Sequence, residues 1–524
     1  MRPLLQEITT AHTPEALVEN LRGEPGVVLL RTSQFDLPSA RYSLVTAKPF
    51  LTFRSFGSRC EITSPAAGPA PQLQFGNPWH LLDVLMARYE LLDEIDSPFP
   101  LGGAFGCWGY DLKNFTEPKL PRRAVNDLEL PDCHVGFYDS LVVFDHRLGR
   151  VTVVVTGLAA DGSRSERRTQ QQSEFWKGRL AASSLSPSPR AWSEPLHPRL
   201  AEAGGGTVVS NLTRADFLAA VERAQRYIRA GDIYQVNLSQ RLSVTLLPAA
   251  EMPNATPEAF RDSPGTETRP AGFTEGWDLF QRLAAVSPAP FAAFLDCGDF
   301  QLASSSPEQF LNLSGSQIIT RPIKGTRPRD ADPTRDAQLA YELQTSPKEL
   351  AELVMITDLL RNDLGRVCEY GSVQTPDLAR LERFAQVQHL VSTVAGRLRP
   401  DVTHFAAFAA CFPGGSITGA PKFRAMEIID ELEPLSRGPY CGSIGYLGFN
   451  RESQLNIVIR TAICKDGVAH FNVGAGIVAD SDPAAEYDET LAKAAGFLAA
   501  LKQGGNRRES ALVKSDGEKS DGES

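Results

Sequence analysis

The chain has 524 residues and a formal net charge of −10, with 42% hydrophobic and 22% charged residues. This composition is typical of a soluble globular protein and excludes wholesale disorder, a collagen-like fibre and a disulfide-packed miniprotein. The acidic balance argues against a nucleic-acid partner, because binding to a phosphate backbone needs clustered Lys and Arg. We find no run of about 18 consecutive apolar residues and therefore expect no membrane span.

The eight cysteines are scattered along the chain, and no two of them form a Cys-x-x-Cys pair. This spacing predicts reduced cysteines in the core and argues against a disulfide or zinc framework. The N-terminal segment MRPLLQEITTAHTPEAL has no unbroken apolar run, so we expect no secretory signal. Together these features predict a cytoplasmic protein.

Residues 1–157 are predicted to form a β-rich region. Runs of β-branched residues occur at 26–32, 141–145 and 150–157, and the letters HRLG between the last two predict a hairpin. The composition then shifts to Ser, Pro, Gln and Gly, which predicts an exposed connector around one short helix over residues 158–210.

The clearest patterns lie in residues 211–502, which we predict to be a second, catalytic region. A strand is expected over residues 234–244, followed by a Pro-rich insertion at 248–272 that has no periodicity and predicts a surface loop. Residues 503–524 end in a polar KSDGE tandem repeat, which cannot bury enough apolar surface to fold and is expected to be disordered.

Lys324 is the first candidate for chemistry. It lies in TRPIKGTRPR, where the flanking Pro and Gly predict a strand end. A lone lysine is usually solvated. A partly buried amine has a lowered pKa, however, and can act as a nucleophile or a base. The residue pattern alone favours the solvated alternative.

Two predicted helices begin with Pro and carry paired glutamates three residues apart. Glu349 and Glu352 follow the first Pro, and Glu486 and Glu489 follow the second, so each pair lies on one helix face. One alternative is structural, with Glu349 closing a capping box and Glu489 pairing with Lys493. The other is that all four carboxylates surround a hard cation such as Mg²⁺, which prefers oxygen ligands.

Weaker candidates follow in the last third of the chain. The segment GGSITGAPK imitates a phosphate-binding loop but lacks the Gly-Lys-Ser/Thr ending, so the nucleotide hypothesis fails. Gly474 and Gly476 would allow close backbone approach to a ligand. Arg460, in a predicted strand NIVIRTAI, is either solvated at a strand edge or clamps a carboxylate. A histidine such as His389 is more often a core residue than a catalyst.

Taken in order, these motifs resemble those of the chorismate-utilising enzymes. The resemblance extends through GDIYQVNLSQR, SSSPEQFL, RPIKGT, ELAELVMITDLLRNDLGRV, VQHLVS, GGSITGAPKFRAMEIIDELEP, GSIGYLGFN, NIVIRTA and GAGIVADSDPAAEYDETLAKA. The first region is similar through LPSARYSLVTAKP and GGAFGCWGYDL. The resemblance implies an α+β fold of two packed β-sheets flanked by outer helices, with both regions in one compact unit.

Two positions distinguish the branches of this family. Members that add water have a lysine where this chain has Gln235, so water is disfavoured as the nucleophile. The motif PIKGT around Lys324 is typical of aminodeoxychorismate synthases, whereas anthranilate synthases resemble PIAGT. The resemblance therefore favours the large subunit of an aminodeoxychorismate synthase, serving 4-aminobenzoate and folate synthesis. Anthranilate synthase component I is the alternative. On this basis the solvated interpretation of Lys324 is abandoned.

The resemblance also implies roles for individual residues. Mg²⁺ would be held by Glu352 and Glu489, with Glu349 and Glu486 nearby. Lys324 would attack C2 of chorismate while Glu308 protonates the leaving C4 hydroxyl, and ammonia would then replace the lysine. The implied substrate contacts are Thr326, His389, Ser416, Tyr446, Arg460, Gly474, Gly476 and Lys493.

None of the eight cysteines lies in a glutaminase-like Gly-x-Cys-x-Gly elbow. The resemblance therefore implies that a separate glutamine amidotransferase subunit supplies the ammonia. Some relatives bind tryptophan near the segment equivalent to LLRTSQFDLPSARYS. Anthranilate synthases resemble LLES where this chain reads LLRT, which argues against tryptophan feedback.

Overall fold

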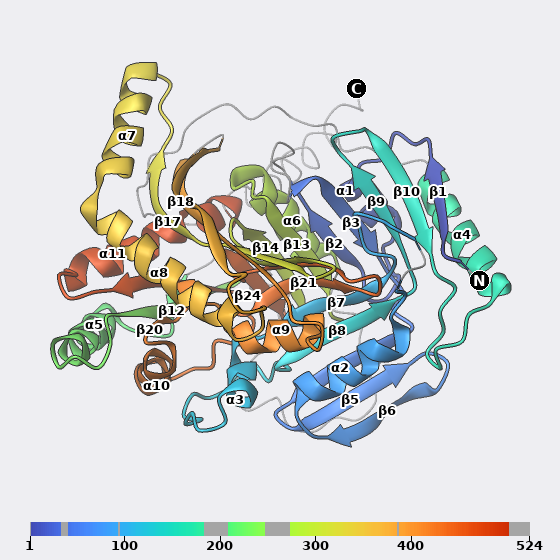
Figure 1. Ribbon diagram of the computed structural model, residues 1–524, viewed down its shortest axis with the longest axis horizontal. Coiled ribbons are helices and arrows are strands. Elements are labelled where there is room, and N and C mark those ends of the chain that lie inside the picture. The colour runs from blue at the N-terminus through green and yellow to red at the C-terminus, as the bar shows by residue number, and fades with distance from the viewer. Residues whose placement is uncertain are drawn as a thin grey trace, which may run out of the picture.

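The computed structural model describes residues 2–32, 40–92, 95–182, 208–246, 273–384 and 387–501. Within these ranges, two antiparallel β-sheets of 12 strands each lie at the centre of the molecule, with helices around them (Figure 1). The predicted α+β fold with two large sheets is therefore confirmed. The predicted insertion at 248–272 and the predicted tail at 503–524 lie outside the described residues.

The first sheet contains strands from both predicted regions. Its order is β1 (Leu4–Ile8), β10 (Arg150–Val155), β9 (Ser140–Asp145), β3 (Tyr42–Thr46), β2 (Val28–Arg31), β13 (Phe291–Asp296), β14 (Gln301–Ser306), β23 (Thr461–Lys465), β24 (Val468–Ile477), β12 (Gln235–Thr245) and β11 (Val209–Ser210), with β20 (Gly419–Ala420) paired to β12. The predicted HRLG hairpin is present as β9 and β10. Because β2 pairs with β13, the N-terminal and C-terminal regions share this sheet.

The second sheet is shared in the same way. Its order is β17 (Ile323–Pro328), β19 (Val387–Arg397), β16 (Gln317–Arg321), β15 (Gln309–Ser314), β22 (Glu452–Asn456), β21 (Ser443–Gly448), β7 (Gly103–Trp108), β8 (Cys133–Tyr138), β4 (Leu51–Phe56), β5 (Arg59–Ser64) and β6 (Gly68–Phe75), with β18 (Gln374–Arg383) paired to β19. Here β7 from the first region pairs with β21 from the second. The two regions thus contribute strands to both sheets.

Several helices begin at a capping side chain, whereas α3 and α10 begin without one. The described helices are α1 (Pro14–Asn20), α2 (Pro78–Tyr89), α3 (Lys113–Thr116), α4 (Glu166–Ala181), α5 (Arg214–Arg229), α6 (Phe273–Val286), α7 (Pro333–Thr345), α8 (Pro347–Gly365), α9 (His404–Cys411), α10 (Lys422–Leu432) and α11 (Pro483–Lys493). Ser346 caps α8 by accepting from the Glu349 amide, and Asp482 caps α11 by accepting from the Ala485 amide. Helix α4 is the predicted short helix within the connector.

The first sheet is buried on both faces. Along β13, alternate residues point to opposite sides. Ala293 and Leu295 join the core between the two sheets, while Ala292 and Phe294 join a second core formed with α1, α4 and α6. Strands buried on both sides read as continuous apolar runs, as FAAFLD does here.

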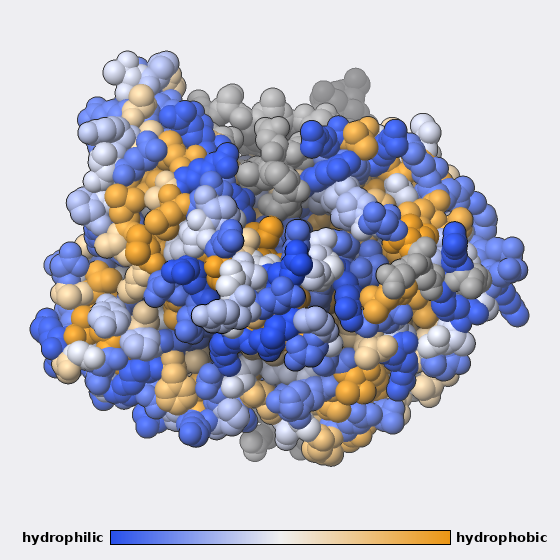
Figure 2. Space-filling view, in the orientation of Figure 1, coloured by the Kyte–Doolittle hydropathy of each residue, from blue (hydrophilic) through white to orange (hydrophobic). Residues whose placement is uncertain are grey.

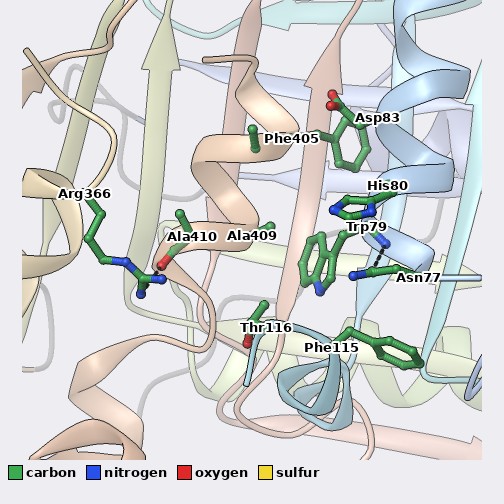
Figure 3. Close-up of a pocket in the computed structure, with 11 residues that line it drawn as sticks. Asn77, Trp79, His80, Asp83, Phe115, Thr116, Arg366, Phe405, Ala409 and Ala410 are labelled. Carbon is green, nitrogen blue, oxygen red and sulfur yellow. Dashed lines mark hydrogen bonds between the residues drawn. The ribbon is translucent and has the colours of Figure 1, made fainter. Parts of the chain in front are cut away.

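The outer helices present mostly polar faces. On the face shown in Figure 2, hydrophobic residues form separate patches within a largely hydrophilic surface. A hollow of about 250 Å³ lies among α2, α3 and α9 and is also lined by Arg366, which donates a hydrogen bond to the Ala410 carbonyl (Figure 3). Within the described ranges no helix is both long enough and apolar enough to span a membrane.

Trp108 tests the packing of the second sheet against its helices. Its fully buried ring packs edge-on against Phe408 at a centroid distance of 5.3 Å and against Phe405 at 6.2 Å. Trp108→Ala should cost about 3–5 kcal/mol and lower the urea unfolding midpoint, because the cavity cannot fully collapse. Val84→Ala, at a side chain that is 67% exposed on α2, is the control and should change the free energy of unfolding by less than about 0.5 kcal/mol. Equal midpoints for the two variants would contradict this packing.

Candidate active site

Lys324 lies on β17 and its amine faces the other sheet. Between Lys324 and Thr326 the pairing with β19 shifts register, and Gly325 adopts a φ of 74°. A bulge of this kind redirects the neighbouring side chains. A Cβ atom placed on Gly476, in β24 of the first sheet, would lie 4.0 Å from the Lys324 Nζ. The amine therefore occupies the space between the two sheets.

Glu308 lies where the chain passes from one sheet to the other. It follows β14 of the first sheet and precedes β15 of the second, and only 6% of the residue is exposed. Burial raises the pKa of Glu308 to about 7, although a hydrogen bond with Ser416 and the positive charge of Lys324 act in the opposite direction. A carboxyl group with a pKa near neutrality is suited to general acid catalysis.

The first turns of α8 and α11 bring the predicted carboxylates together. The pKa of Glu352 is raised, first by burial and further by the charges of Glu349 and Glu489, while Lys324 lowers it. The pKa of Glu486 is likewise raised by burial and by the charge of Glu489. The positive charge of the Lys324 amine thus lies close enough to lower the pKa of both Glu352 and Glu308.

Two of the four glutamates that could hold a metal ion also form ion pairs with neighbouring side chains. Glu349 pairs with Arg327 at 3.3 Å and Glu489 pairs with Lys493 at 2.7 Å. No group of three or more His, Cys, Asp or Glu side chains in the described part of the chain is arranged to hold a metal ion. Mg²⁺ often takes only one or two protein carboxylates and completes its shell with water and substrate oxygens. An all-oxygen donor set of neighbouring carboxylates fits that chemistry, and magnesium stays a prediction.

Arg460 provides a positive charge on the opposite side of the site. The predicted strand around it is wrong, because β22 belongs to the second sheet and β23 to the first, and the chain crosses between them. Arg460 ends this crossing with a φ of 50°, directly before β23. Burial lowers the pKa of its guanidinium, and its charge helps to lower the pKa of His389. A buried cation of this kind favours an anionic ligand.

His389 is held as a neutral side chain. Its Nδ1 atom lies 2.9 Å from the Oγ1 atom of Thr326 on the neighbouring strand. Burial first, and then the charge of Arg460, lowers the pKa of His389 to about 4. The ring is therefore uncharged near neutral pH, and it can exchange a hydrogen bond with a ligand but cannot supply a positive charge.

Gly474 and Gly476 allow β24 to pass very close to neighbouring groups. A Cβ atom on Gly474 would lie 2.7 Å from the hydroxyl oxygen of Tyr440, and one on Gly476 would lie 2.4 Å from the Nε2 atom of Gln235. Lys493 donates a hydrogen bond to the Gly474 carbonyl at 2.9 Å. The Oε1 atom of Gln235 is buried and has no hydrogen-bond partner among the described residues, so an acceptor is available there.

The structure separates Tyr446 from the other predicted substrate contacts. Tyr446 stacks on Phe105 and lines a different cavity of about 780 Å³ between the sheets, together with Arg31 and Tyr42 of the segment that resembles a tryptophan site. The tyrosine whose hydroxyl reaches Gly474 is Tyr440, which the sequence analysis missed. Its position in the glycine-rich connection GPYCGS was the available signal, because binding residues are disproportionately found in the connections between elements.

The remaining predicted residues lie around one space between the sheets. An amine, a carboxyl group with a pKa near neutrality, a carboxylate cluster and a buried arginine together define an enzyme active site for an anionic substrate. The chain belongs to the chorismate binding enzyme family, whose model matches residues 43–256 and 266–499. It is therefore a chorismate-utilising enzyme.

Curated relatives carry two different activities at similar identity. Aminodeoxychorismate synthase component 1 of Klebsiella aerogenes is 38% identical over 474 residues, which cover 90% of this chain and 93% of that protein. Anthranilate synthase component 1 of Acetivibrio thermocellus is 35% identical over 518 residues, which cover 97% of this chain and 96% of that protein. Identity alone does not select between the two activities.

Solved structures agree on the fold. Anthranilate synthase component I from Streptococcus pneumoniae TIGR4 matches with a TM-score of 0.70 and 30% identity, covering 88% of this chain and 93% of that chain. The menaquinone-specific isochorismate synthase MenF of Escherichia coli matches with a TM-score of 0.65, covering 95% and 94%. At 16% identity, the second likeness shows the fold alone.

Replacing Glu308 by Gln should change how stability depends on pH. The folded chain keeps the Glu308 proton up to a pKa of about 7, whereas the unfolded chain loses it at a lower pH. The contribution of this bound proton to the free energy of unfolding is present at low pH and is lost as the pH rises through the folded-state pKa. The wild-type chain should therefore lose stability relative to Glu308→Gln between about pH 5 and about pH 8. Thermal melting measures this, and parallel pH profiles would contradict it.

Proposed function

We propose that the chain is the large subunit of an aminodeoxychorismate synthase, which converts chorismate and ammonia to 4-amino-4-deoxychorismate for 4-aminobenzoate and folate synthesis. The observation that carries this proposal is the position of Lys324. Its amine lies between the two sheets, and its positive charge lowers the pKa of the carboxyl groups of Glu308 and Glu352. The resemblance places an alanine at this position in anthranilate synthases, so the two activities differ at the residue that would act as nucleophile.

The residues account for a two-stage substitution. The neutral Lys324 amine bonds to C2 of chorismate, the ring double bond shifts, and the C4–O bond breaks. Glu308 gives its proton to the departing hydroxyl, which leaves as water, and the alkylated Lys324 nitrogen stays protonated as a secondary ammonium, so that it can later leave as a neutral amine. Ammonia then bonds to C4, the double bond shifts back, and the C2–N bond to Lys324 breaks. The proton lost by the added ammonia returns to Glu308.

The other side chains hold the substrate during these steps. Arg460, Tyr440 and the Gly474 backbone would bind the enolpyruvyl carboxylate, because Arg460 is a partly buried cation and the Tyr440 hydroxyl lies against Gly474. Glu352 and Glu489, with Glu349 and Glu486 nearby, would hold Mg²⁺, which when bound would neutralise the carboxylates and attract the ring carboxylate. His389 and Thr326 would bind a neutral oxygen of the substrate.

A second subunit is part of this proposal. The relatives named above are each called component 1 of their synthase, which fits a partner component. We infer that a glutamine amidotransferase supplies ammonia to this chain. Ammonium salts at high concentration would then replace the partner in vitro.

The products of chorismate, Mg²⁺ and ammonium decide between the two activities. The proposal predicts a product that keeps the enolpyruvyl group and becomes 4-aminobenzoate only after a separate lyase is added. Anthranilate synthase is the second candidate, since the chain is 35% identical to such an enzyme along 97% of its length. Release of pyruvate with fluorescent anthranilate would establish that candidate and refute the proposal.

Removal of the lysine amine should abolish most of the turnover. Lys324→Ala should lower kcat with ammonium by about 100-fold or more, which corresponds to about 2.7 kcal/mol of transition-state stabilisation. Lys348→Ala is a control in the same neighbourhood, because Lys348 is exposed and its charge also lowers the pKa of Glu352 and Glu486. It should change kcat only a few-fold. Wild-type kcat in Lys324→Ala would exclude the covalent role.

A further inference from the structure

Arg437 is a buried charge that the proposed chemistry does not use. It lies between α10 and β21, with its side chain 2% exposed. Its Nε and Nη2 atoms donate to the two carboxylate oxygens of Glu433, at 2.8 and 2.7 Å. Glu433 also accepts from the backbone amide and the hydroxyl of Ser239 on β12, at 2.8 and 3.1 Å. The ion pair is thus hydrogen-bonded on both sides and anchored to the first sheet.

The same guanidinium connects two segments that carry site residues. Nη2 donates to the Asn237 carbonyl on β12 at 2.7 Å, and Nη1 donates to the Ile417 carbonyl at 3.2 Å. Ile417 directly follows Ser416, whose side chain hydrogen-bonds the Glu308 carboxyl group. One side chain therefore ties strand β12 to the short helical turn that supports the proposed acid.

Arg437 also packs against the tyrosine of the carboxylate-binding surface. Its Cζ atom lies 5.7 Å from the centroid of the Tyr440 ring, and the Tyr440 amide donates to the Arg437 carbonyl at 3.1 Å. The Asn237 amide nitrogen approaches the same place, since a Cβ atom on Gly474 would lie 3.2 Å from it. Burial raises the pKa of Tyr440 well above its usual value, although a hydrogen bond between the side chains of Asn237 and Tyr440 lowers that pKa.

We propose that Arg437 is a positioning residue that couples the two halves of the active site. It fixes the Glu308 acid through Ile417 and Ser416, and it fixes the surface at Gly474 through Tyr440 and Asn237. The inference rests on the proposed function for the reaction that is measured. Lysine cannot replace arginine here, because the guanidinium makes four hydrogen bonds, two of them to one carboxylate, whereas a lysine ammonium has only three donors on a single atom.

Lys113 provides a matched control for a purely structural role. It is also 2% exposed, and it pairs with Asp111 at 3.6 Å and with Asp430 at 3.8 Å. Its Nζ atom lies 4.8 Å from the Tyr110 ring centroid, and the Arg437 Cζ atom lies 4.8 Å from the same centroid. None of the ion pairs or side-chain hydrogen bonds of Lys113 among the described residues reaches β12, Ser416 or Gly474. Loss of Lys113 should therefore affect stability alone.

The test compares Arg437→Lys with Lys113→Met in the full chain. We expect Arg437→Lys to raise the KM and the calorimetric Kd for chorismate about tenfold, the equivalent of one lost hydrogen bond of about 1.4 kcal/mol. The groups that face Glu308 are the Lys324 amine, the Cys441 thiol, the Ser416 hydroxyl and the Ile323 amide, and the hydrogen bond with Ser416 lowers the pKa of Glu308. A displaced Ser416 should therefore move the alkaline limb of the kcat profile to higher pH. Lys113→Met should lower only the melting temperature.

Each outcome decides the inference. A raised Kd together with a shifted pH limb in Arg437→Lys, but not in Lys113→Met, supports it. A wild-type Kd and pH limb in folded Arg437→Lys overturns it, whatever the melting temperature. If Arg437→Lys does not fold, Arg437→Gln combined with Glu433→Gln removes both charges and is measured in the same way. A wild-type chain without turnover refutes the proposed function instead, and the Kd comparison still decides the role of Arg437.

Discussion

The burial of opposite charges between two sheets is the constraint on which this active site depends. Charged groups cannot leave water unless other charges or hydrogen bonds compensate them. Here the Lys324 amine lies between Glu308 and Glu352, while Arg460 has only burial acting on its pKa. The space therefore has an excess of positive charge on one side and of carboxylate on the other. A substrate with two carboxylates, assisted by a divalent cation, would complete both sides.

The fold supplies this arrangement because its sheets are interleaved. Glu308 and Arg460 each lie where the chain crosses between the sheets, Glu308 directly before β15 and Arg460 directly before β23. Both side chains are therefore held by strand pairing on either side. Gly474 and Gly476 on β24 leave room for the Tyr440 hydroxyl and for the Gln235 side chain of β12. Strands from the first 157 residues complete both sheets, so a catalytic region without them would lack its neighbours.

Local features could be predicted from the sequence and long-range ones could not. The Ser346 cap and the HRLG hairpin depend on neighbouring residues, and the structure has both. The strand expected at Arg460 is absent because an apolar run crosses between sheets there, which periodicity does not reveal. Tyr446 and Tyr440 are six positions apart in a glycine-rich stretch, and only the three-dimensional pairing of β21 with β7 shows which of them faces Gly474.

The central claim is that Lys324 forms a covalent bond with the substrate. Intact-mass measurement of the wild-type chain, incubated with chorismate and Mg²⁺ but without ammonia, tests it most directly. The account predicts an added mass equal to chorismate minus water, located on the peptide that contains Lys324 and removed when ammonium is supplied. An unmodified chain that nevertheless aminates chorismate at the wild-type rate would contradict it.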